Sequence, residues 1–289
     1  MIRILLTGKN GQVGRELERT LAPLGEVIAL DRSGLDLADP DRIRAAVREA
    51  KPGIIVNAAA WTAVDRAESE EAAALAINGA APGILAEESK RLGALLVHYS
   101  TDYVFNGTSA RAYTEDDEPN PVGAYGRTKL AGEQAIRAAG GRHLIFRTSW
   151  VYGLHGHNFL KTILRLAAER DELRVVADQV GAPTWSRMIA EATALAIARL
   201  DGQDGLYHLT AAGETSWHGF AEAILAGALQ AGLLECSPPV RRITTADFPT
   251  PARRPANSRL DNARLAADFG IALPGWGRQL DLCLGGDQL

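Results

Sequence analysis

Three side chains that can hold or transfer a proton lie in two short motifs, Ser100-Thr101-Asp102-Tyr103 and Tyr125-Gly126-Arg127-Thr128-Lys129. Residues four apart on a helix project from one face, so Tyr125 and Lys129 are expected to lie side by side. The Lys129 ammonium is then expected to draw the pKa of the Tyr125 phenol toward neutrality, which suits general acid–base chemistry. Thr101, expected at the end of a strand, adds a hydroxyl for the same substrate oxygen. These three catalytic candidates predict carbonyl reduction by hydride transfer.

A glycine-rich segment, Gly8-Lys9-Asn10-Gly11-Gln12-Val13-Gly14, stands between the first expected strand and the first expected helix. Gly8 permits a tight turn, Gly11 lets the backbone approach a pyrophosphate, and Gly14 allows the helix to pack closely on the sheet. A pyrophosphate bound there would face unpaired amides and the positive end of the helix. The segment therefore predicts a dinucleotide cofactor.

The end of the second expected strand carries residues that bear on the choice between NADH and NADPH. Asp31 is placed to accept hydrogen bonds from the adenosine ribose, which favours NADH. Arg32 beside it either pairs with the 2′-phosphate of NADPH or is a solvated surface arginine, and the sequence leaves both open. Asp36 and Leu37 are either adenine-side contacts or part of a helix-capping region. We therefore predict NADPH or NADH as the cofactor.

Short apolar runs alternate with helical patterns in the first half of the chain, which predicts a parallel sheet with crossover helices. Strands are expected at 2–7, 26–30, 54–58, 95–99, 143–148 and 173–177. Helices are expected at 13–21, 41–50, 67–77, 80–92, 124–138, 159–169, 187–200 and 217–231. The residues singled out, Gly8, Asp31, Ala60, Thr101 and Trp150, each follow one of the first five strands, at the sheet edge where ligands bind.

The predicted fold class is therefore α/β, a Rossmann-type doubly wound parallel sheet with a smaller mixed α/β lobe. We expect residues 1–150 to form the NAD(P)-binding domain. Residues 151–289 are expected to form a substrate-binding lobe that interleaves with the first domain.

Composition excludes several classes of protein. The chain has 289 residues, is 46% hydrophobic and is 23% charged, which allows a sizeable core and argues against disorder. A net charge of −4 argues against nucleic acid as a partner. No apolar run approaches a membrane span of about 20 residues. The chain enters a strand directly, without a signal-peptide layout, so we expect a cytoplasmic protein that binds a small molecule.

Metal ligation is not expected. His98, His155, His157 and Asp178 match no ligand spacing, and His98 lies inside the fourth expected strand, where a satisfied core histidine is the simpler interpretation. Cys236 and Cys283 are far apart in sequence and are not expected to bind a metal or form a bridge.

The chain resembles the extended short-chain dehydrogenase/reductase superfamily and, within it, the family of dTDP-4-dehydrorhamnose reductases. The resemblance spans nearly the whole chain. Besides the glycine segment and the two catalytic motifs, it is carried by four groups of residues. These are 56–60 with 62–65, 98–105, 146–152 and 178–184 with 249–255.

The resemblance implies NAD(P)H-dependent reduction of the C4 ketone of dTDP-4-dehydro-β-L-rhamnose, with Tyr125 protonating the C4 oxygen. Thr101 would orient the carbonyl, and Lys129 would hold the nicotinamide ribose. The residues implied to line the cofactor are Gly11, Gln12, Val13, Asp31, Asp36, Leu37, Ala60 and Thr62. The residues implied to contact the sugar are Asp102 and Trp150. Asn158, Gln179 and Arg254 are candidates for the nucleotide end of the substrate, with a structural role as the equal alternative.

One departure bears on assembly. Some members of the family bind magnesium between subunits through a glutamate cluster, and Arg187 stands at one of those positions here. This argues against a metal-bridged dimer and leaves a monomer or a homodimer open.

Three alternatives remain. The first is reduction of another dTDP-4-keto-6-deoxysugar, and the second is a nucleotide-sugar epimerase or dehydratase on the same fold. Dehydratases place an Asp-Glu pair after the threonine, whereas here Tyr103 follows Asp102. The third alternative is a non-catalytic NADP-binding regulatory subunit. Loss of the tyrosine or lysine would favour that interpretation, yet Tyr125 and Lys129 are both present.

Overall fold

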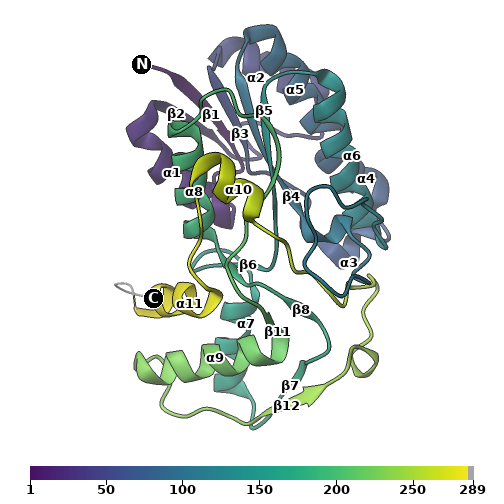
Figure 1. The fold of residues 1–289 in the computed structure, drawn as a ribbon, viewed down its shortest axis with the longest axis vertical. Coiled ribbons are helices and arrows are strands. Elements are labelled where there is room, and N and C mark those ends of the chain that lie inside the picture. Colours follow the sequence, from purple (N-terminus) through teal and green to yellow (C-terminus); the bar gives the residue numbers. More distant parts are fainter. Residues whose placement is uncertain (286–289) are drawn as a thin grey trace.

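The computed structural model describes residues 1–285, and its centre is a six-stranded sheet in the order β10-β5-β4-β3-β1-β2 (Figure 1). All neighbouring strands in it are parallel. Its strands are β1 (Arg3–Thr7), β2 (Glu26–Leu30), β3 (Ile54–Asn57), β4 (Leu95–Thr101), β5 (His143–Thr148) and β10 (Gly205–His208). The predicted Rossmann-type α/β fold is confirmed.

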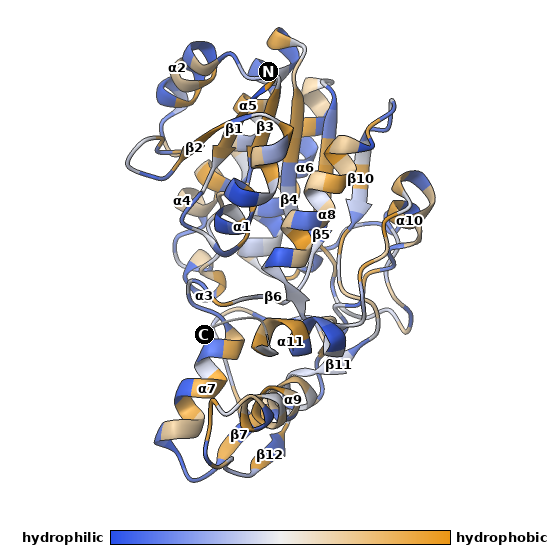
Figure 2. Ribbon diagram, turned by 90° about the vertical axis from the view of Figure 1, so that its left-hand side faces the viewer, coloured by the Kyte–Doolittle hydropathy of each residue, from blue (hydrophilic) through white to orange (hydrophobic). Residues whose placement is uncertain are grey.

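Helices cover both faces of this sheet because its strands are apolar on both sides. In β1, Ile4 and Leu6 pack into one core and Leu5 into the other, and all three are fully buried. Figure 2 shows β1 and β3 as a largely hydrophobic band. The first face is covered by α1 (Gln12–Leu21), α8 (Ser186–Ala198) and α10 (Ala263–Phe269). The second face is covered by α2 (Pro40–Ala50), α5 (Ala81–Leu92) and α6 (Ala124–Ala139).

The single helix expected at 67–77 is only partly correct, because residues 68–70 are not helical. The chain instead forms α3 (Val64–Ala67), α4 (Glu71–Leu75) and a π-helical turn, η2 (Ala76–Ala80). Asn78 in that turn bonds the backbone N–H and carbonyl of Trp61 at 2.8 and 3.1 Å. The turn also lies against α6, where a Cβ on Gly132 would come within 2.1 Å of the Asn78 carbonyl oxygen. Tertiary contacts therefore override the helical pattern.

A second core lies below the carboxyl ends of the sheet (Figure 1). In this lobe, α9 (Trp217–Gln230) packs on both α7 (Phe159–Glu169) and the C-terminal α11 (Trp276–Gly285). Its short strands are β6 (Val151–Tyr152), β7 (Leu173–Val176), β8 (Val180–Gly181), β9 (Thr184–Trp185), β11 (Thr215–Ser216) and β12 (Val240–Ile243). Short 3₁₀ turns are η1 (Ala22–Leu24), η3 (Asp102–Val104) and η4 (Thr245–Asp247).

The sixth expected strand, at 173–177, forms β7 but does not join the main sheet. β7 pairs with β12 in a separate two-stranded sheet, and β10 takes the outer place beside β5. Alternating burial along β7 shows a strand with one exposed side, unlike the fully buried β3. Among residues 1–285, no helix is long and apolar enough to cross a membrane.

Candidate active site

A cleft of about 710 Å³ opens at the carboxyl ends of the strands. Every residue predicted to bind the cofactor lines it, except Gly14. These lining residues are Gly8, Gly11, Gln12, Val13, Asp31, Arg32, Asp36, Leu37, Ala60, Thr62, Tyr125 and Lys129. The structure thus brings the glycine segment and two predicted catalytic residues into one cavity.

The glycine segment forms a turn that only glycine fits at two positions. Gly8 has φ +77°, and a Cβ there would come within 2.7 Å of the Ala59 backbone nitrogen. A Cβ on Gly14 would come within 2.1 Å of the Gly8 carbonyl oxygen. Gly14 therefore acts by letting α1 approach the turn, which is why it does not line the cleft. Gly11 caps α1 without a side-chain hydrogen bond, so helix amides remain for an anion.

Asp31 is held as a carboxylate at the end of β2. Its Oδ1 accepts from the N–H and hydroxyl of Ser33 at 3.0 and 2.6 Å and from Gly34 N–H at 3.2 Å. Its Oδ2 accepts from Asn10 Nδ2 at 3.1 Å. These hydrogen bonds, that of the Ser33 hydroxyl first, lower the pKa of Asp31 to about 2. Asp31 therefore presents a carboxylate to the cleft at neutral pH.

Arg32 and Asp36 lie beside it on the rim of the cleft. The Arg32 side chain is 81% exposed, and its Nε lies 3.6 Å from Asp36 Oδ2. Such an exposed ion pair is weak, so Arg32 can leave Asp36 for a stronger anion.

These observations fit a bound dinucleotide. The cleft has a turn without side chains, uncapped helix amides and a fixed carboxylate, in the chain order that NAD(P) requires. Ala58, Ala59 and Ala60 add a wall of small side chains at the end of β3.

The Thr101 side chain lies close enough to the Tyr125 phenol to lower its pKa. Thr101 Oγ1 also donates to Asp102 Oδ1 at 3.0 Å and accepts from the Tyr103 N–H at 3.2 Å. Tyr103 packs edge-on against Tyr125, with ring centroids 5.5 Å apart. The two motifs predicted to act together are therefore in direct contact.

The expected lowering of the Tyr125 pKa by Lys129 does not occur in this structure. The pKa of Tyr125 is raised, first by burial and next by the nearby Asp102 carboxylate, and the Thr101 side chain only partly opposes this. Lys129 Nζ instead donates to the Tyr99 carbonyl at 2.6 Å and lies 3.2 Å from His98 Nε2. The phenol therefore stays protonated, which suits a proton donor.

The predicted sugar-contacting residues flank this group. Asp102 is 3% exposed, and its Oδ2 has no hydrogen-bond partner among the described residues. Trp150 adopts a left-handed φ of +47° and stacks on Trp217 at 3.6 Å between ring centroids. A Cβ on Gly181 would come within 2.6 Å of the Trp150 ring. A bulky residue in this conformation is uncommon and is held by its surroundings.

Arg254 lies next to the catalytic motifs. Its Nη1 donates to the Tyr103 hydroxyl at 3.0 Å, and its Nη2 donates to Asp65 Oδ2 at 2.9 Å. Because Tyr103 contacts Tyr125, the guanidinium is one residue removed from the phenol.

Asn158 and Gln179 have structural partners instead. Asn158 caps α7 through the Lys161 N–H, and its Nδ2 donates to Gln12 Oε1 at 2.9 Å and to the Gly153 carbonyl at 2.8 Å. Gln179 accepts from the Trp217 indole at 3.1 Å and donates to the Thr245 hydroxyl at 3.0 Å. Both amides are engaged and buried, so the structure favours the structural alternative for these two residues.

Some cleft residues were missed by sequence reasoning. They include Asn10, Leu35, Trp61, Arg66, Ile77, Tyr99, Val151 and His157. Asn10 could have been predicted, because its amide lies inside the glycine segment, next to the expected ribose site. His157 belongs to a loop of the second lobe, and no local pattern indicates that it approaches the first.

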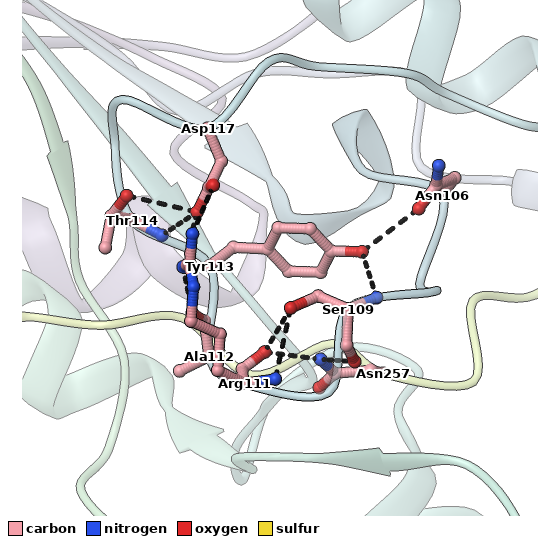
Figure 3. Close-up of polar contacts among 8 residues, drawn as sticks. All are labelled: Asn106, Ser109, Arg111, Ala112, Tyr113, Thr114, Asp117 and Asn257. Carbon is pink, nitrogen blue, oxygen red and sulfur yellow. Dashed lines mark hydrogen bonds and ion pairs between the residues drawn. The ribbon is translucent and has the colours of Figure 1, made fainter.

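A network of polar contacts fixes the loop that joins the two catalytic motifs (Figure 3). Arg111 forms a two-point ion pair with Asp117 at 2.8 and 2.6 Å. Asn257 Nδ2 donates to the carbonyls of Ser109 and Arg111 at 2.9 and 2.8 Å. Tyr113 stacks on Phe105. The loop is therefore anchored to the C-terminal segment as well as to itself.

Comparisons with known proteins identify the family of the chain. The family model described as the RmlD substrate binding domain matches residues 2–288. The dTDP-4-dehydrorhamnose reductase of Burkholderia thailandensis is 52% identical, with 98% of each chain covered. The corresponding enzyme of Escherichia coli K12 is 47% identical, covering 95% of this chain and 94% of the relative.

Solved structures give the same result. A dTDP-4-dehydrorhamnose reductase from Bacillus anthracis in complex with NADP superposes with a TM-score of 0.92 at 35% identity, covering 98% of both chains. A UDP-glucose 4-epimerase from Thermus thermophilus with NAD has a TM-score of 0.82 at 21% identity, which shows a shared fold alone. The chain belongs to the RmlD family, that of the dTDP-4-dehydrorhamnose reductases.

Proposed function

We propose that this protein reduces the C4 ketone of dTDP-4-dehydro-β-L-rhamnose to give dTDP-L-rhamnose, using NADPH or NADH. The observation that carries the proposal is the placement of Tyr125 and Lys129 in the same cleft as the glycine segment. Members of its family with 52% and 47% identity bear this activity in their names. The enzyme is an NAD(P)H-dependent oxidoreductase of dTDP-rhamnose biosynthesis.

Tyr125 is the proton donor in this proposal. Bound NAD(P)H supplies the hydride for the C4 carbon, and the Tyr125 phenol gives its proton to the C4 oxygen. Burial keeps that phenol protonated until the oxygen becomes strongly basic. Thr101, beside Tyr125, orients the same oxygen, while Lys129 holds the nicotinamide ribose.

Asp102 and Trp150 are proposed to contact the sugar. Asp102 has a free carboxylate oxygen next to Thr101, and sugar hydroxyls are suited to donate to it. Arg254 is proposed for the diphosphate, because a guanidinium binds phosphate oxygens in pairs. It would then exchange its contact with Asp65 for the substrate.

The test is a coupled assay with enzymatically made dTDP-4-keto-6-deoxysugars, read by cofactor oxidation and product mass. The proposal predicts saturable oxidation with the L-rhamnose precursor and a product two hydrogens heavier. Preference for a different dTDP-4-keto-6-deoxysugar would establish the nearest alternative.

A dehydratase activity is tested separately with dTDP-glucose and NAD. Tyr103 stands where dehydratases keep a glutamate, and its hydroxyl is bonded to Arg254 at 3.0 Å. We therefore expect no 4-keto-6-deoxysugar to form. Its appearance would refute the reductase assignment.

Two further predictions concern the cellular location and the oligomeric state. We propose that the protein acts in the cytoplasm as a monomer or a homodimer without a bridging metal. Arg187 Nε lies 3.3 Å from Glu16 Oε2, and its guanidinium lies over the Trp185 ring. A positive charge next to the Glu16 carboxylate disfavours a metal ion there. Light scattering with and without a chelator measures the oligomeric state directly.

A further inference from the structure

A row of buried polar side chains crosses the sheet behind Lys129. Thr7 on β1, Asn57 on β3 and His98 on β4 are in register across neighbouring parallel strands. All three are at most 2% exposed. Two positions earlier, on the same face, the same strands carry fully buried apolar residues, Leu5, Ile55 and Leu96. This face of the three strands therefore changes from apolar to polar residues toward their carboxyl ends.

The row is a continuous chain of hydrogen bonds that ends on Lys129. Thr7 Oγ1 lies 2.6 Å from the Asn57 amide oxygen, and the Asn57 amide nitrogen lies 3.1 Å from His98 Nδ1. The other ring nitrogen, His98 Nε2, lies 3.2 Å from Lys129 Nζ. Thr7 directly precedes Gly8, so the chain connects the start of the cofactor turn with the lysine.

Lys129 has three N–H donors and no acceptor while it is charged. One donor is bonded to the Tyr99 carbonyl at 2.6 Å, and His98 Nε2 is in range of a second. Lys129 also lines the cleft, although it is only 2% exposed. With two donors held from behind, one N–H remains for the cleft.

This contact determines which ring nitrogen of His98 carries the proton. A charged Lys129 can only donate, so Nε2 must be the acceptor and Nδ1 must bear the hydrogen. Nδ1–H then needs an acceptor, which the Asn57 amide provides after a half rotation that exchanges its oxygen and nitrogen. The Thr7 hydroxyl accommodates this, since it can donate or accept. The opposite tautomer would require a neutral Lys129.

We propose that His98 is a positioning residue for the reduction. Its neutral imidazole accepts a hydrogen bond from the Lys129 ammonium and, with the Tyr99 carbonyl, leaves a single N–H for the cleft. This inference rests on the proposed function, in which Lys129 acts in the cleft.

The surroundings keep His98 neutral. Burial, and next the Lys129 charge, hold the pKa of His98 well below its ordinary value. Burial also lowers the pKa of Lys129 to about 8, opposed by Glu133 one turn further along α6. Glu133 is paired with Arg147 from β5 and with Arg137. Thr7 and Asn57 carry no charge. Because His98 Nε2 accepts from the Lys129 ammonium, it favours the charged lysine. Removing the imidazole should therefore lower the Lys129 pKa further.

The direct test reads the tautomer of His98 by ¹⁵N NMR of the histidine side chains in the unmodified protein. The His98 signals are assigned as those absent from the spectrum of His98→Gln. The inference predicts protonated Nδ1 and bare Nε2, with no titration between pH 5 and 7.5. Protonated Nε2, or a titration near pH 6.5, would overturn it.

The kinetic test compares His98→Leu, which removes the acceptor, with His98→Gln, whose amide oxygen can replace it. We expect His98→Leu to lower kcat by about tenfold to a hundredfold, the worth of a hydrogen bond to a charged group. The alkaline limb of the kcat profile should move at least about one pH unit lower. His98→Gln should restore most of kcat and reverse most of the shift of the alkaline limb, with KM for the sugar little changed.

His218→Gln is the matched control. His218 is also buried, at 5% exposure, and its Nε2 lies 3.1 Å from the Val240 carbonyl in the other lobe. It should leave the pH profile unmoved even if it lowers stability. Equal profiles for His98→Leu and the wild type would reduce His98 to a packing residue. If the wild type reduces no keto-sugar, the proposed function fails, and the NMR result still decides whether His98 accepts from Lys129.

Discussion

At the scale of single residues, the chemistry depends on how Tyr125 shares its surroundings with Thr101 and Asp102. The Thr101 hydroxyl donates to Asp102 and accepts from the Tyr103 N–H, and it lies close enough to the phenol to lower the pKa of Tyr125. Burial and the Asp102 carboxyl keep the phenol protonated. The sequence predicted that Thr101 and Tyr125 would come together. It could not predict the contact between Lys129 and His98, because that contact depends on strand register.

Replacing Tyr125 by Phe removes the proton donor and keeps the ring. We expect kcat to fall by about 10²–10⁴, the usual worth of general acid catalysis. Binding of NADPH, measured by fluorescence titration, should change little. A variant that keeps more than half of the wild-type kcat would remove Tyr125 from the mechanism.

Arg32 and Asp31 oppose each other in the choice of cofactor. Asp31 repels a 2′-phosphate, whereas Arg32 can pair with one, and each effect is worth about 1–3 kcal/mol if desolvated. We therefore expect both cofactors to be used, with less than about a hundredfold difference in kcat/KM. Arg32→Ala should raise KM for NADPH selectively. An equal effect on NADH would show that Arg32 is only a surface residue.

The buried carboxyl of Asp102 predicts a pH-dependent stability. Burial raises the pKa of Asp102 to about 6. A raised carboxyl pKa means that the folded protein binds this proton more tightly, so stability is lost as pH rises through 6. The free energy of unfolding of Asp102→Asn should therefore exceed that of the wild type by about 2–3 kcal/mol above pH 7. This difference should vanish below pH 4. Urea unfolding at both pH values measures this, and a pH-independent difference would contradict it.

At the scale of elements, glycines bring helices against the residues of the site. Gly14 brings α1 onto the turn at Gly8, and Gly126 brings α6 onto η3, where a Cβ would come within 2.1 Å of the Tyr103 carbonyl oxygen. The sequence predicted the first contact because the glycine spacing indicates it. The second was not predicted, because Gly126 lies between Tyr125 and Arg127 with no pattern of its own.

Gly14→Ala tests this packing. Its Cβ would clash with the Gly8 carbonyl, so we expect a loss of about 1–3 kcal/mol in the free energy of unfolding and weaker NADPH binding. Gly277→Ala on α11 is the control, because nothing lies within 4 Å of its Cβ, and it should be neutral or slightly stabilising. Similar stability for both variants would show that α1 can move away at no cost.

At the scale of the whole molecule, the chain crosses repeatedly between its two cores. After residue 150 it builds most of the second core, yet α8, β10 and α10 return to the sheet. We propose that the substrate lobe excludes these three elements. The parallel order and the first five strands of the main sheet were predictable from local patterns. The place of β10 and the contact of His157 with the cleft depend on long-range packing, so they could not be predicted.

The central claim is that a hydride from the nicotinamide reaches C4 of the keto-sugar in this cleft. The most direct measurement supplies NADPH deuterated at the transferable position together with dTDP-4-dehydro-β-L-rhamnose, and locates the label in the product by NMR. We predict one deuterium per molecule, at C4 of dTDP-L-rhamnose, with one NADPH oxidised for each product. A label at another carbon, or a product formed without label, would contradict the claim.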